Sequence, residues 1–222
     1  TSSGIHATPI GEFVMANMLA LSRRLPRAHD LKQARAWPEN RWEEMRGQEL
    51  RDKTLGILGY GSIGREVARL AHAFGMRVLA LNASGRRRQT GYRIPGTGDP
   101  DGDIPEGWYR PEELYAFLAR CDVVVLTLPL ISDTYGMIDE RALGTLHEEA
   151  LVINISRGEL IQEDALIVAL RENRIGGAAL DVFQEEPLPS DHPFYDMDSV
   201  IVTPHMAGIT PQYNERLTDL FA

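Results

Sequence analysis

The chain has 222 residues, of which 43% are hydrophobic and 25% are charged, as in an ordinary globular protein. Its 23 basic and 32 acidic residues give a formal net charge of −9, which argues against a nucleic acid or an anionic membrane surface as the main partner. No run approaches the roughly 18 apolar residues of a transmembrane helix. A single cysteine, Cys121, excludes an internal disulfide framework and a cysteine-based zinc site. We expect a cytoplasmic protein.

The first fifty residues are predicted to lie outside the main pattern. Residues 8–25 predict a helix, because Pro9 suits the first turn and apolar residues recur at helical spacing. Residues 27–50 form a polar arm that carries Trp37 and Trp42 among charged side chains. Two tryptophans on a polar arm indicate an interface, and a small local core beneath the arm is the alternative.

Strands and helices alternate after residue 50. Short apolar runs predict strands, and amphipathic runs between them predict helices. The predicted strands are 53–59, 76–82, 122–127, 150–155, 177–181 and 199–203, and the predicted helices are 61–75, 112–120 and 163–172. Strands that are apolar throughout and alternate with helices indicate a parallel sheet. We therefore predict an α/β fold, a doubly wound parallel sheet with helices on both faces.

Residues 83–110 interrupt this pattern with glycines, prolines and no periodicity, so we predict a long loop without regular structure. Its first part holds Arg86, Arg87 and Arg88 with no acid among them, and acidic residues follow from Asp99 onward. A loop of this length in a compact domain is usually functional or mobile, and the sequence leaves its role open.

The segment from Gly59 to Gly64 has the spacing G-x-G-x-x-G and stands between a predicted strand and a predicted helix. In that context Gly59 permits a tight turn, Gly61 leaves room for a pyrophosphate and Gly64 lets the helix pack against the strand. Backbone amides at the helix start then favour phosphate groups. An ordinary strand-to-helix turn is the alternative. We favour a dinucleotide site, which makes the predicted fold Rossmann-type.

The residues after the second strand bear on the choice of dinucleotide. NAD-binding proteins usually carry a carboxylate at the end of this strand, whereas this chain has Asn82 followed by three arginines. Asn82 would not repel a 2′-phosphate, and arginines such as Arg86 and Arg87 can bind one. A solvated basic loop is the alternative. The sequence therefore favours NADP over NAD as the cofactor.

Three further motifs follow the later strands. They are Asn-Ile-Ser-Arg-Gly at 154–158, Asp-Val-Phe-Gln-Glu-Glu-Pro at 181–187 and Thr-Pro-His-Met-Ala-Gly at 203–208. Carboxyl ends of parallel strands line the ligand crevice of such sheets, so we expect these motifs to meet there. Arg157 offers a fork for a carboxylate, and a histidine such as His205 can exchange a proton near neutral pH. A glutamate on the other imidazole nitrogen would hold the ring.

With the glycine turn, these motifs make the chain resemble the D-2-hydroxyacid dehydrogenase family over essentially its whole length. The resemblance implies an NAD(P)-dependent oxidoreductase that transfers a hydride between its cofactor and a 2-keto or D-2-hydroxy acid. It selects Glu186, which directly precedes a proline, over Glu185, and it implies the catalytic set Arg157, Glu186 and His205. Further cofactor contacts that it implies are Ser62, Ile63, Leu128, Pro129, Ile155, Ser156, Asp181 and Gly208. Asp181 is expected to bond the nicotinamide carboxamide.

The resemblance also implies a domain organisation. Residues 1–222 would be one dinucleotide-binding domain, with a helical linker and dimer arm at 1–50 and the Rossmann core at 51–208. Residues 209–222 would start a helix that returns to a substrate domain absent from this chain. We expect a domain that is inactive alone, forms a homodimer and serves a small-molecule 2-keto or 2-hydroxy acid. His192 is close in sequence to Glu186 but lies in a proline-rich loop, so it is not expected to be the catalytic histidine. No metal is expected, because the six histidines show no metal-ligand spacing.

Two alternatives stay open at the level of sequence. A nucleotide-sensing interaction module, similar to the C-terminal-binding-protein corepressors, resembles the same family, and its partners bind outside these motifs. A dehydrogenase of another donor, such as formate or phosphonate, is the second alternative. Glu186 argues against formate, because formate enzymes usually carry a glutamine there.

Overall fold

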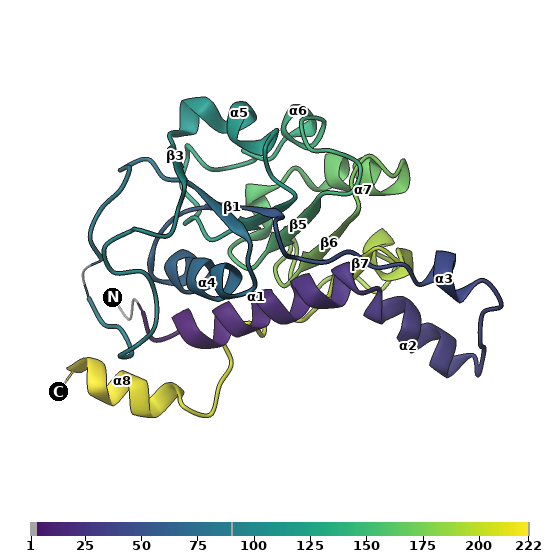
Figure 1. The fold of residues 1–222 in the computed structure, drawn as a ribbon, viewed down its shortest axis with the longest axis horizontal. Coiled ribbons are helices and arrows are strands. Elements are labelled where there is room, and N and C mark those ends of the chain that lie inside the picture. Colours follow the sequence, from purple (N-terminus) through teal and green to yellow (C-terminus); the bar gives the residue numbers. More distant parts are fainter. Residues whose placement is uncertain (1–3, 90, 222) are drawn as a thin grey trace.

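The computed structural model describes residues 4–89 and 91–221, and its centre is one parallel β-sheet (Figure 1). The seven strands within this described part are β1 (Thr54–Leu58), β2 (Arg77–Leu81), β3 (Gly107–Tyr109), β4 (Val123–Leu126), β5 (Leu151–Asn154), β6 (Gly177–Leu180) and β7 (Val200–Val202). They lie in the order β3-β2-β1-β4-β5-β6-β7, and every pairing is parallel. The order reverses between β1 and β4, which is the switch point where doubly wound sheets bind ligands. The predicted fold class is confirmed.

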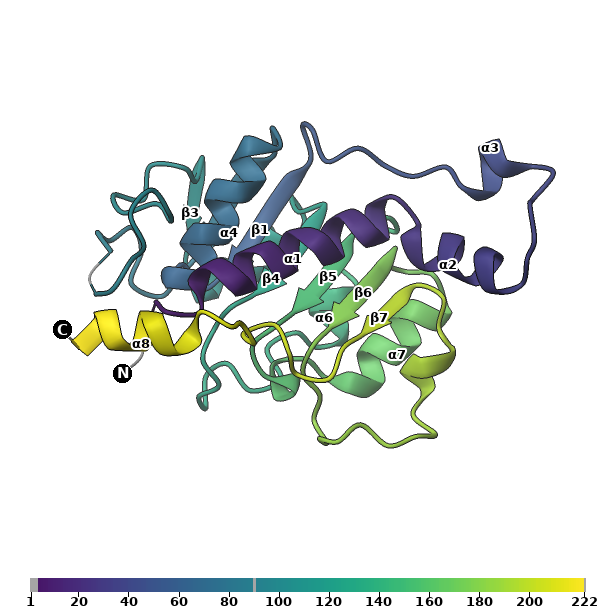
Figure 2. The ribbon, with the colours of Figure 1, turned by 90° about the horizontal axis from the view of Figure 1, so that it is seen from below.

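Helices cover both faces of the sheet (Figures 1 and 2). The α-helices are α1 (Ala7–Ser22), α2 (Leu25–Gln33), α3 (Arg41–Glu44), α4 (Ser62–Ala73), α5 (Leu114–Leu118), α6 (Glu140–Leu143), α7 (Glu163–Arg171) and α8 (Tyr213–Phe221), and short 3-10 helices lie at Pro111–Glu113, Gly158–Leu160 and Pro193–Asp196. Helices α1 and α4 pack together on one face, where Val14, Met18 and Val67 are fully buried. Helices α5, α6 and α7 cover the other face around Phe117.

Side chains of each strand alternate between these two layers. Leu55 and Ile57 of β1 pack with α1 and α4, whereas Leu58 packs with the layer of α5, α6 and α7. Gly56 faces that same layer and touches Cys121 so closely that no Cβ would fit. Both faces of the sheet are therefore buried, which is why its strands are continuous apolar runs in the sequence.

The six predicted strands are found within one residue of their predicted ends, and two other predictions need correction. The helix predicted over 8–25 ends at Ser22, because Pro26 cannot continue it; the chain turns at Arg24, whose φ is +53°, and α2 follows. The prediction of no regular structure over 83–110 was wrong at its end, where β3 joins the sheet beside β2. Three residues are too few to show a strand period.

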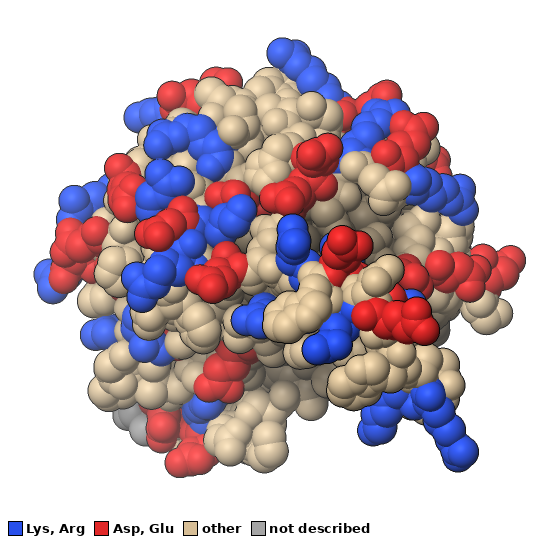
Figure 3. All heavy atoms as spheres, turned by 45° about the vertical axis from the view of Figure 1, so that its right-hand side comes forward, with Lys and Arg blue, Asp and Glu red and all other residues tan. Residues whose placement is uncertain are grey.

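Helices α2 and α3 form an arm that projects from the body (Figure 2). Trp37 and Trp42 on this arm are 83% and 76% exposed. Positive and negative side chains are interspersed over the face that Figure 3 shows. None of the helices in the described residues is long and apolar enough to cross a membrane.

Candidate active site

The turn between β1 and α4 has the shape of a phosphate cradle. Gly59 has a φ of +95°, and Gly64 lies against the Gly59 carbonyl and Ile57, where no Cβ would fit. Gly61 differs, because a Cβ there would meet no described atom within 4 Å. Gly61 is also the N-cap of α4, and no side chain in the described residues caps the helix there. The first amides of α4 are thus available to an anion, beside open space.

A cavity of about 470 Å³ adjoins this turn. Its walls come from the turn, from the loops after β4 and β5, and from the chain before α1: Gly4, His6, Gly61, Ser62, Ile63, Gly64, Thr127, Leu128, Pro129, Leu130, Ser156 and Arg157. The Ser156 hydroxyl donates a hydrogen bond to the Leu128 carbonyl, which ties the loops after β4 and β5 together. The structure therefore brings the predicted pyrophosphate and ribose contacts to one place.

A second cavity of about 570 Å³ shares a wall with the first, because His6, Ile63, Thr127, Ser156 and Arg157 line both. Its other walls include the predicted residues of the later strand ends, Ile155, Asp181, His205 and Gly208. Side chains from the ends of β1, β4, β5, β6 and β7 thus face one cleft at the carboxyl edge of the sheet.

His205 and Glu186 form a hydrogen-bonded pair, with Nδ1 of the imidazole 2.8 Å from Oε2 of the carboxylate. A carboxylate only accepts, so Nδ1 carries a proton and Nε2 is left for the cavity that His205 lines. The Phe183 amide donates to the other carboxylate oxygen at 3.1 Å. Burial acts to raise the pKa of Glu186, but the bonds from His205 and Phe183 and the charge of Arg157 outweigh it, and this pKa lies below its ordinary value.

Asp181 is 1% exposed and organises the loop that carries His205. Its Oδ1 accepts from the Thr203 hydroxyl at 2.7 Å and from the Met206 amide at 2.9 Å, and its Oδ2 accepts from the Ala207 amide at 2.8 Å. His205 has a φ of +50°, which is uncommon for a residue with a side chain and needs such support. Oδ2 keeps capacity for one more donor, so the predicted carboxamide contact is compatible with this role.

Arg157 stands on a turn shaped by residues that sequence analysis did not single out. The buried Asn154 side chain donates to the Arg157 carbonyl at 2.8 Å and accepts from the Ser156 amide at 3.1 Å. Gly158 lies directly on the Phe183 backbone, where no Cβ would fit. These contacts bring the loop after β5 against the loop after β6. Their signal in the sequence is the asparagine and the glycine that flank the arginine.

His6 is another residue that sequence analysis did not single out, and it lines both cavities. Its Nδ1 lies 3.2 Å from the Gly208 carbonyl, and its ring stacks on Tyr213 with centroids 5.4 Å apart. A carbonyl only accepts, so Nδ1 is the donor of this hydrogen bond. His6 and Gly208 are 202 positions apart in the chain, and no local motif signals their contact.

Asn82, Arg86 and Arg87 lie outside the lining of both cavities. The Asn82 amide donates to the Ser84 hydroxyl at 3.0 Å and to the Gly85 carbonyl at 3.1 Å, so it closes the turn after β2. Arg86 forms an ion pair within its own loop. The expected basic site after β2 is therefore beside the cleft and not part of its walls.

His192 is engaged away from the cleft. Its Nδ1 accepts from the Phe194 amide at 3.3 Å, and its Nε2 donates to Glu163 at 3.2 Å. Over residues 4–89 and 91–221, no group of three or more His, Cys, Asp or Glu side chains could hold a metal ion.

Comparisons with known proteins agree with this geometry. Residues 15–207 match the family model described as D-isomer specific 2-hydroxyacid dehydrogenase, NAD binding domain. A glyoxylate reductase of Thermofilum pendens is 33% identical over 221 residues, 99% of this chain and 61% of that protein. An (S)-sulfolactate dehydrogenase of Chromohalobacter salexigens is 34% identical over 98% of this chain and 65% of that protein.

Solved structures show the same arrangement of the chain. The NADPH-dependent glyoxylate/hydroxypyruvate reductase from Sinorhizobium meliloti, in complex with NADP and sulfate, superposes with a TM-score of 0.75 at 29% identity. The match covers 95% of this chain and 62% of that one. This chain thus spans about three fifths of the length of the relatives that it matches.

Proposed function

This chain belongs to the D-isomer specific 2-hydroxyacid dehydrogenase family, and we propose that it is the NAD(P)-binding domain of an oxidoreductase acting on a 2-keto or D-2-hydroxy acid. The observation that carries the proposal is one cleft in which Arg157 and the His205–Glu186 pair stand next to the open space at Gly61. The names of the relatives from Thermofilum and Chromohalobacter support the substrate class.

The cleft fits a nicotinamide dinucleotide. The uncapped amides of α4 and the space beside Gly61 suit its pyrophosphate, and Leu128 and Pro129 stand beside them. We assign Asp181, which lines the second cavity together with His205, to the nicotinamide half. When bound, the cofactor supplies or accepts the hydride at the substrate carbon.

The chain's own residues supply charge and a proton. Arg157 is permanently charged and holds the substrate carboxylate and the polarised carbonyl oxygen. Nε2 of the protonated His205 gives its proton to the developing alkoxide in reduction and takes it back in oxidation. Glu186 fixes the imidazole through Nδ1 and stabilises its protonated form by its negative charge.

The proposal extends to cofactor choice and assembly. The absence of an acid at position 82, where Asn82 stands, favours NADP. Residues 1–50 would serve as linker and dimer arm, 51–208 as the Rossmann core and 209–222 as the return to a substrate domain. Exposed Trp37 and Trp42 line a groove of about 580 Å³ on the arm, which supports burial of this surface in a homodimer. A cytoplasmic location stays a prediction.

The test is reduction of 2-keto acids by the full-length protein, followed by the loss of NADPH or NADH absorbance. Glyoxylate, hydroxypyruvate and 3-sulfopyruvate are the first substrates, because the relatives' names point to them. We expect turnover with at least one of them and cofactor binding by this chain alone. Cofactor binding with no keto acid reduced would favour the corepressor-like module, which gains no support from the matched proteins. No binding of either dinucleotide would overturn the proposal.

A further inference from the structure

His6 is held in the cleft through one of its two ring nitrogens. Nδ1 donates to the Gly208 carbonyl at 3.2 Å. The ring also stacks on Tyr213 of α8, with centroids 5.4 Å apart and planes inclined by 30°. The other ring nitrogen, Nε2, makes no hydrogen bond with any residue of the described ranges 4–89 and 91–221. His6 therefore brings a fixed ring to both cavities, with one nitrogen available to a ligand.

The chain on either side of His6 is also fixed. The Ile5 side chain is 1% exposed. Helix α8 lies beside the start of α1 (Figures 1 and 2), and Arg216 of α8 donates to the Ile5 carbonyl at 3.4 Å. Gly4 has a φ of +103° and lies against the Tyr92 carbonyl, where no Cβ would fit. The segment that carries His6 is thus packed between α8 and the loop of residues 83–106.

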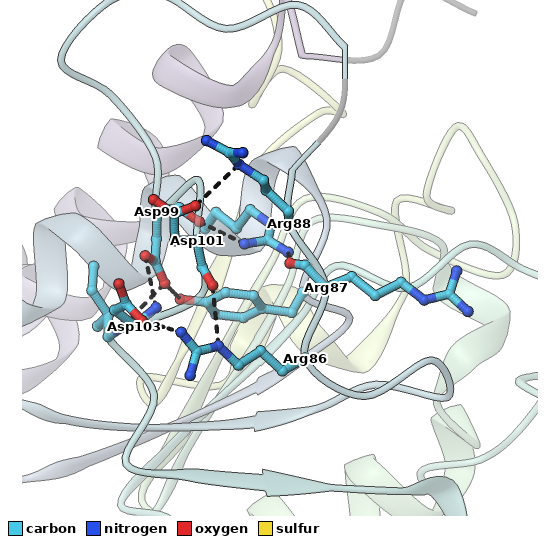
Figure 4. Close-up of polar contacts among 9 residues, drawn as sticks. Arg86, Arg87, Arg88, Asp99, Asp101 and Asp103 are labelled. Carbon is cyan, nitrogen blue, oxygen red and sulfur yellow. Dashed lines mark hydrogen bonds and ion pairs between the residues drawn. The ribbon is translucent and has the colours of Figure 1, made fainter.

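This loop gives firm support because it is fastened to the glycine motif (Figure 4). The Asp99 carboxylate accepts from the Tyr60 hydroxyl at 2.7 Å, and it also accepts from the amides of residues 103 and 104. Arg65 donates to the Asp99 carbonyl. Tyr60, Arg65 and Asp99 are at most 5% exposed. Buried polar groups that are hydrogen-bonded define one conformation, because any other would leave them unpaired. His6 therefore belongs to a wall that is formed before a ligand arrives.

The cleft offers more positive groups and donors than its own acids can satisfy. Among the described residues that line the two cavities, Asp181 is the only acid. Its carboxylate already serves three donors. Arg157 makes no ion pair with a described residue, and its guanidinium donates to the neighbouring Ser156 carbonyl. Arg157 and His6, which line both cavities together, are thus left for the anions of a ligand.

A substrate with a single carboxylate uses only part of this set. In the proposed reaction Arg157 holds the carboxylate and His205 serves the carbonyl oxygen, so His6 is left over. We propose that His6 Nε2 binds a second anionic group of the substrate, and that the protein prefers doubly charged 2-keto acids to singly charged ones. The chemical class is a 2-keto acid with a sulfonate or a carboxylate on C3. This inference rests on the proposed function and deepens it by naming the substrate class.

The two histidines of the cleft differ in the partner of Nδ1. His205 faces the Glu186 carboxylate, whose charge stabilises the protonated ring before substrate arrives. His6 faces the neutral carbonyl of Gly208. A negative group at Nε2 of His6 favours a proton there, so that both nitrogens then donate. The difference suits His205 to proton transfer and His6 to binding an anion.

The experiment is steady-state kinetics of the full-length protein. The doubly charged substrates are 3-sulfopyruvate and oxaloacetate, and the singly charged ones are glyoxylate and hydroxypyruvate. The wild-type protein should show its highest kcat/KM with a doubly charged acid. His6→Leu should lower that kcat/KM at least tenfold more than the kcat/KM for glyoxylate, mainly through KM, because a charge-assisted contact is lost. His72→Leu is the matched control and should keep the wild-type order of substrates, because His72 is exposed on α4 and makes no polar side-chain contact within the described residues.

Three results would overturn the inference. The first is a wild-type protein that reduces glyoxylate or hydroxypyruvate but neither doubly charged acid. The second is an equal loss with all substrates in His6→Leu, which would mean that His6 only holds the loop of His205 through Gly208. The third is a rise in the NADPH Kd of His6→Leu that accounts for the loss, which would make His6 a cofactor ligand. Turnover by the wild-type protein upholds the proposed function in each of these cases, whereas a wild-type protein that reduces none of the four acids overturns both.

Discussion

Asp181→Asn tests whether this carboxylate holds the loop of His205 or serves only as a cofactor ligand. The substitution keeps the size of the side chain and replaces one acceptor oxygen with an NH2 group. In the protein, Oδ1 serves Thr203 and Met206, and Oδ2 serves the Ala207 amide. If the asparagine NH2 group takes the place of Oδ2, it meets the backbone N–H of Ala207, and two donors cannot bond each other. If it takes the place of Oδ1, it meets the donors of Thr203 and Met206 instead, so at least one hydrogen bond to the buried carboxylate is lost in either case.

The size of the effect follows from this loss. A hydrogen bond to a charged group contributes about 1.5–3 kcal/mol to the free energy of unfolding. Asp181 is 1% exposed, so water cannot replace the lost partner. For a protein of this length, 1 kcal/mol shifts Tm by about 2–4 °C, so we expect Tm to fall by about 3–12 °C.

The assay is thermal unfolding followed by circular dichroism without any cofactor. Asp191→Asn is the matched control, because Asp191 is exposed in the same β6–β7 connection and makes no polar contact within the described residues. The control should keep the wild-type Tm. An Asp181→Asn chain that unfolds within about 1 °C of wild type but binds cofactor weakly would refute the structural role and leave Asp181 a ligand only.

Three further predictions concern the His205–Glu186 pair, Cys121 and the arm formed by α2 and α3. The pKa of Glu186 lies below its ordinary value of 4.5, so this carboxylate is charged and the His205–Glu186 pair is intact at neutral pH. Glu186→Gln in the full-length enzyme should move the falling limb of the pH–rate profile for reduction to lower pH, because protonated His205 then loses the anion that stabilises it. An unmoved limb contradicts this. Burial raises the pKa of the Cys121 thiol to about 12, so iodoacetamide should label the chain at neutral pH only in denaturant, and labelling of the folded chain contradicts the buried thiol. Trp37→Ser with Trp42→Ser should halve the mass of a dimer in light scattering, and an unchanged dimer mass argues against the arm as interface.

The sheet and the central residues of the site could be predicted because their signals are local. The strands are buried on both faces, so each is an apolar run that ends where its polar motif begins. The motifs of Arg157, Glu186 and His205 follow three neighbouring strands, and parallel strands bring their carboxyl ends to one edge. Glu186 and not Glu185 contacts the histidine, as the following proline implied.

The parts that sequence analysis missed depend on contacts between distant residues. Strand β3 is too short to show a period, and its place beside β2 depends on the fold of residues 83–106. The arginines after β2 looked like one basic site, because their pairing with Asp101 and Asp103 crosses more than ten residues of irregular chain. His6 enters the cleft only because α1 lies along the sheet and carries the preceding residues to Gly208.

Steady-state kinetics of His205→Ala in the full-length protein, with NADPH affinity measured in parallel, tests the central claim most directly. Loss of a general acid should lower kcat for 2-keto acid reduction by about 10²–10⁴-fold, because no group then protonates the alkoxide. The NADPH Kd should stay within a few-fold, because His205 Nδ1 is engaged with Glu186 and Asp181 holds the loop through its backbone. A His205→Ala enzyme that keeps full turnover would contradict the account.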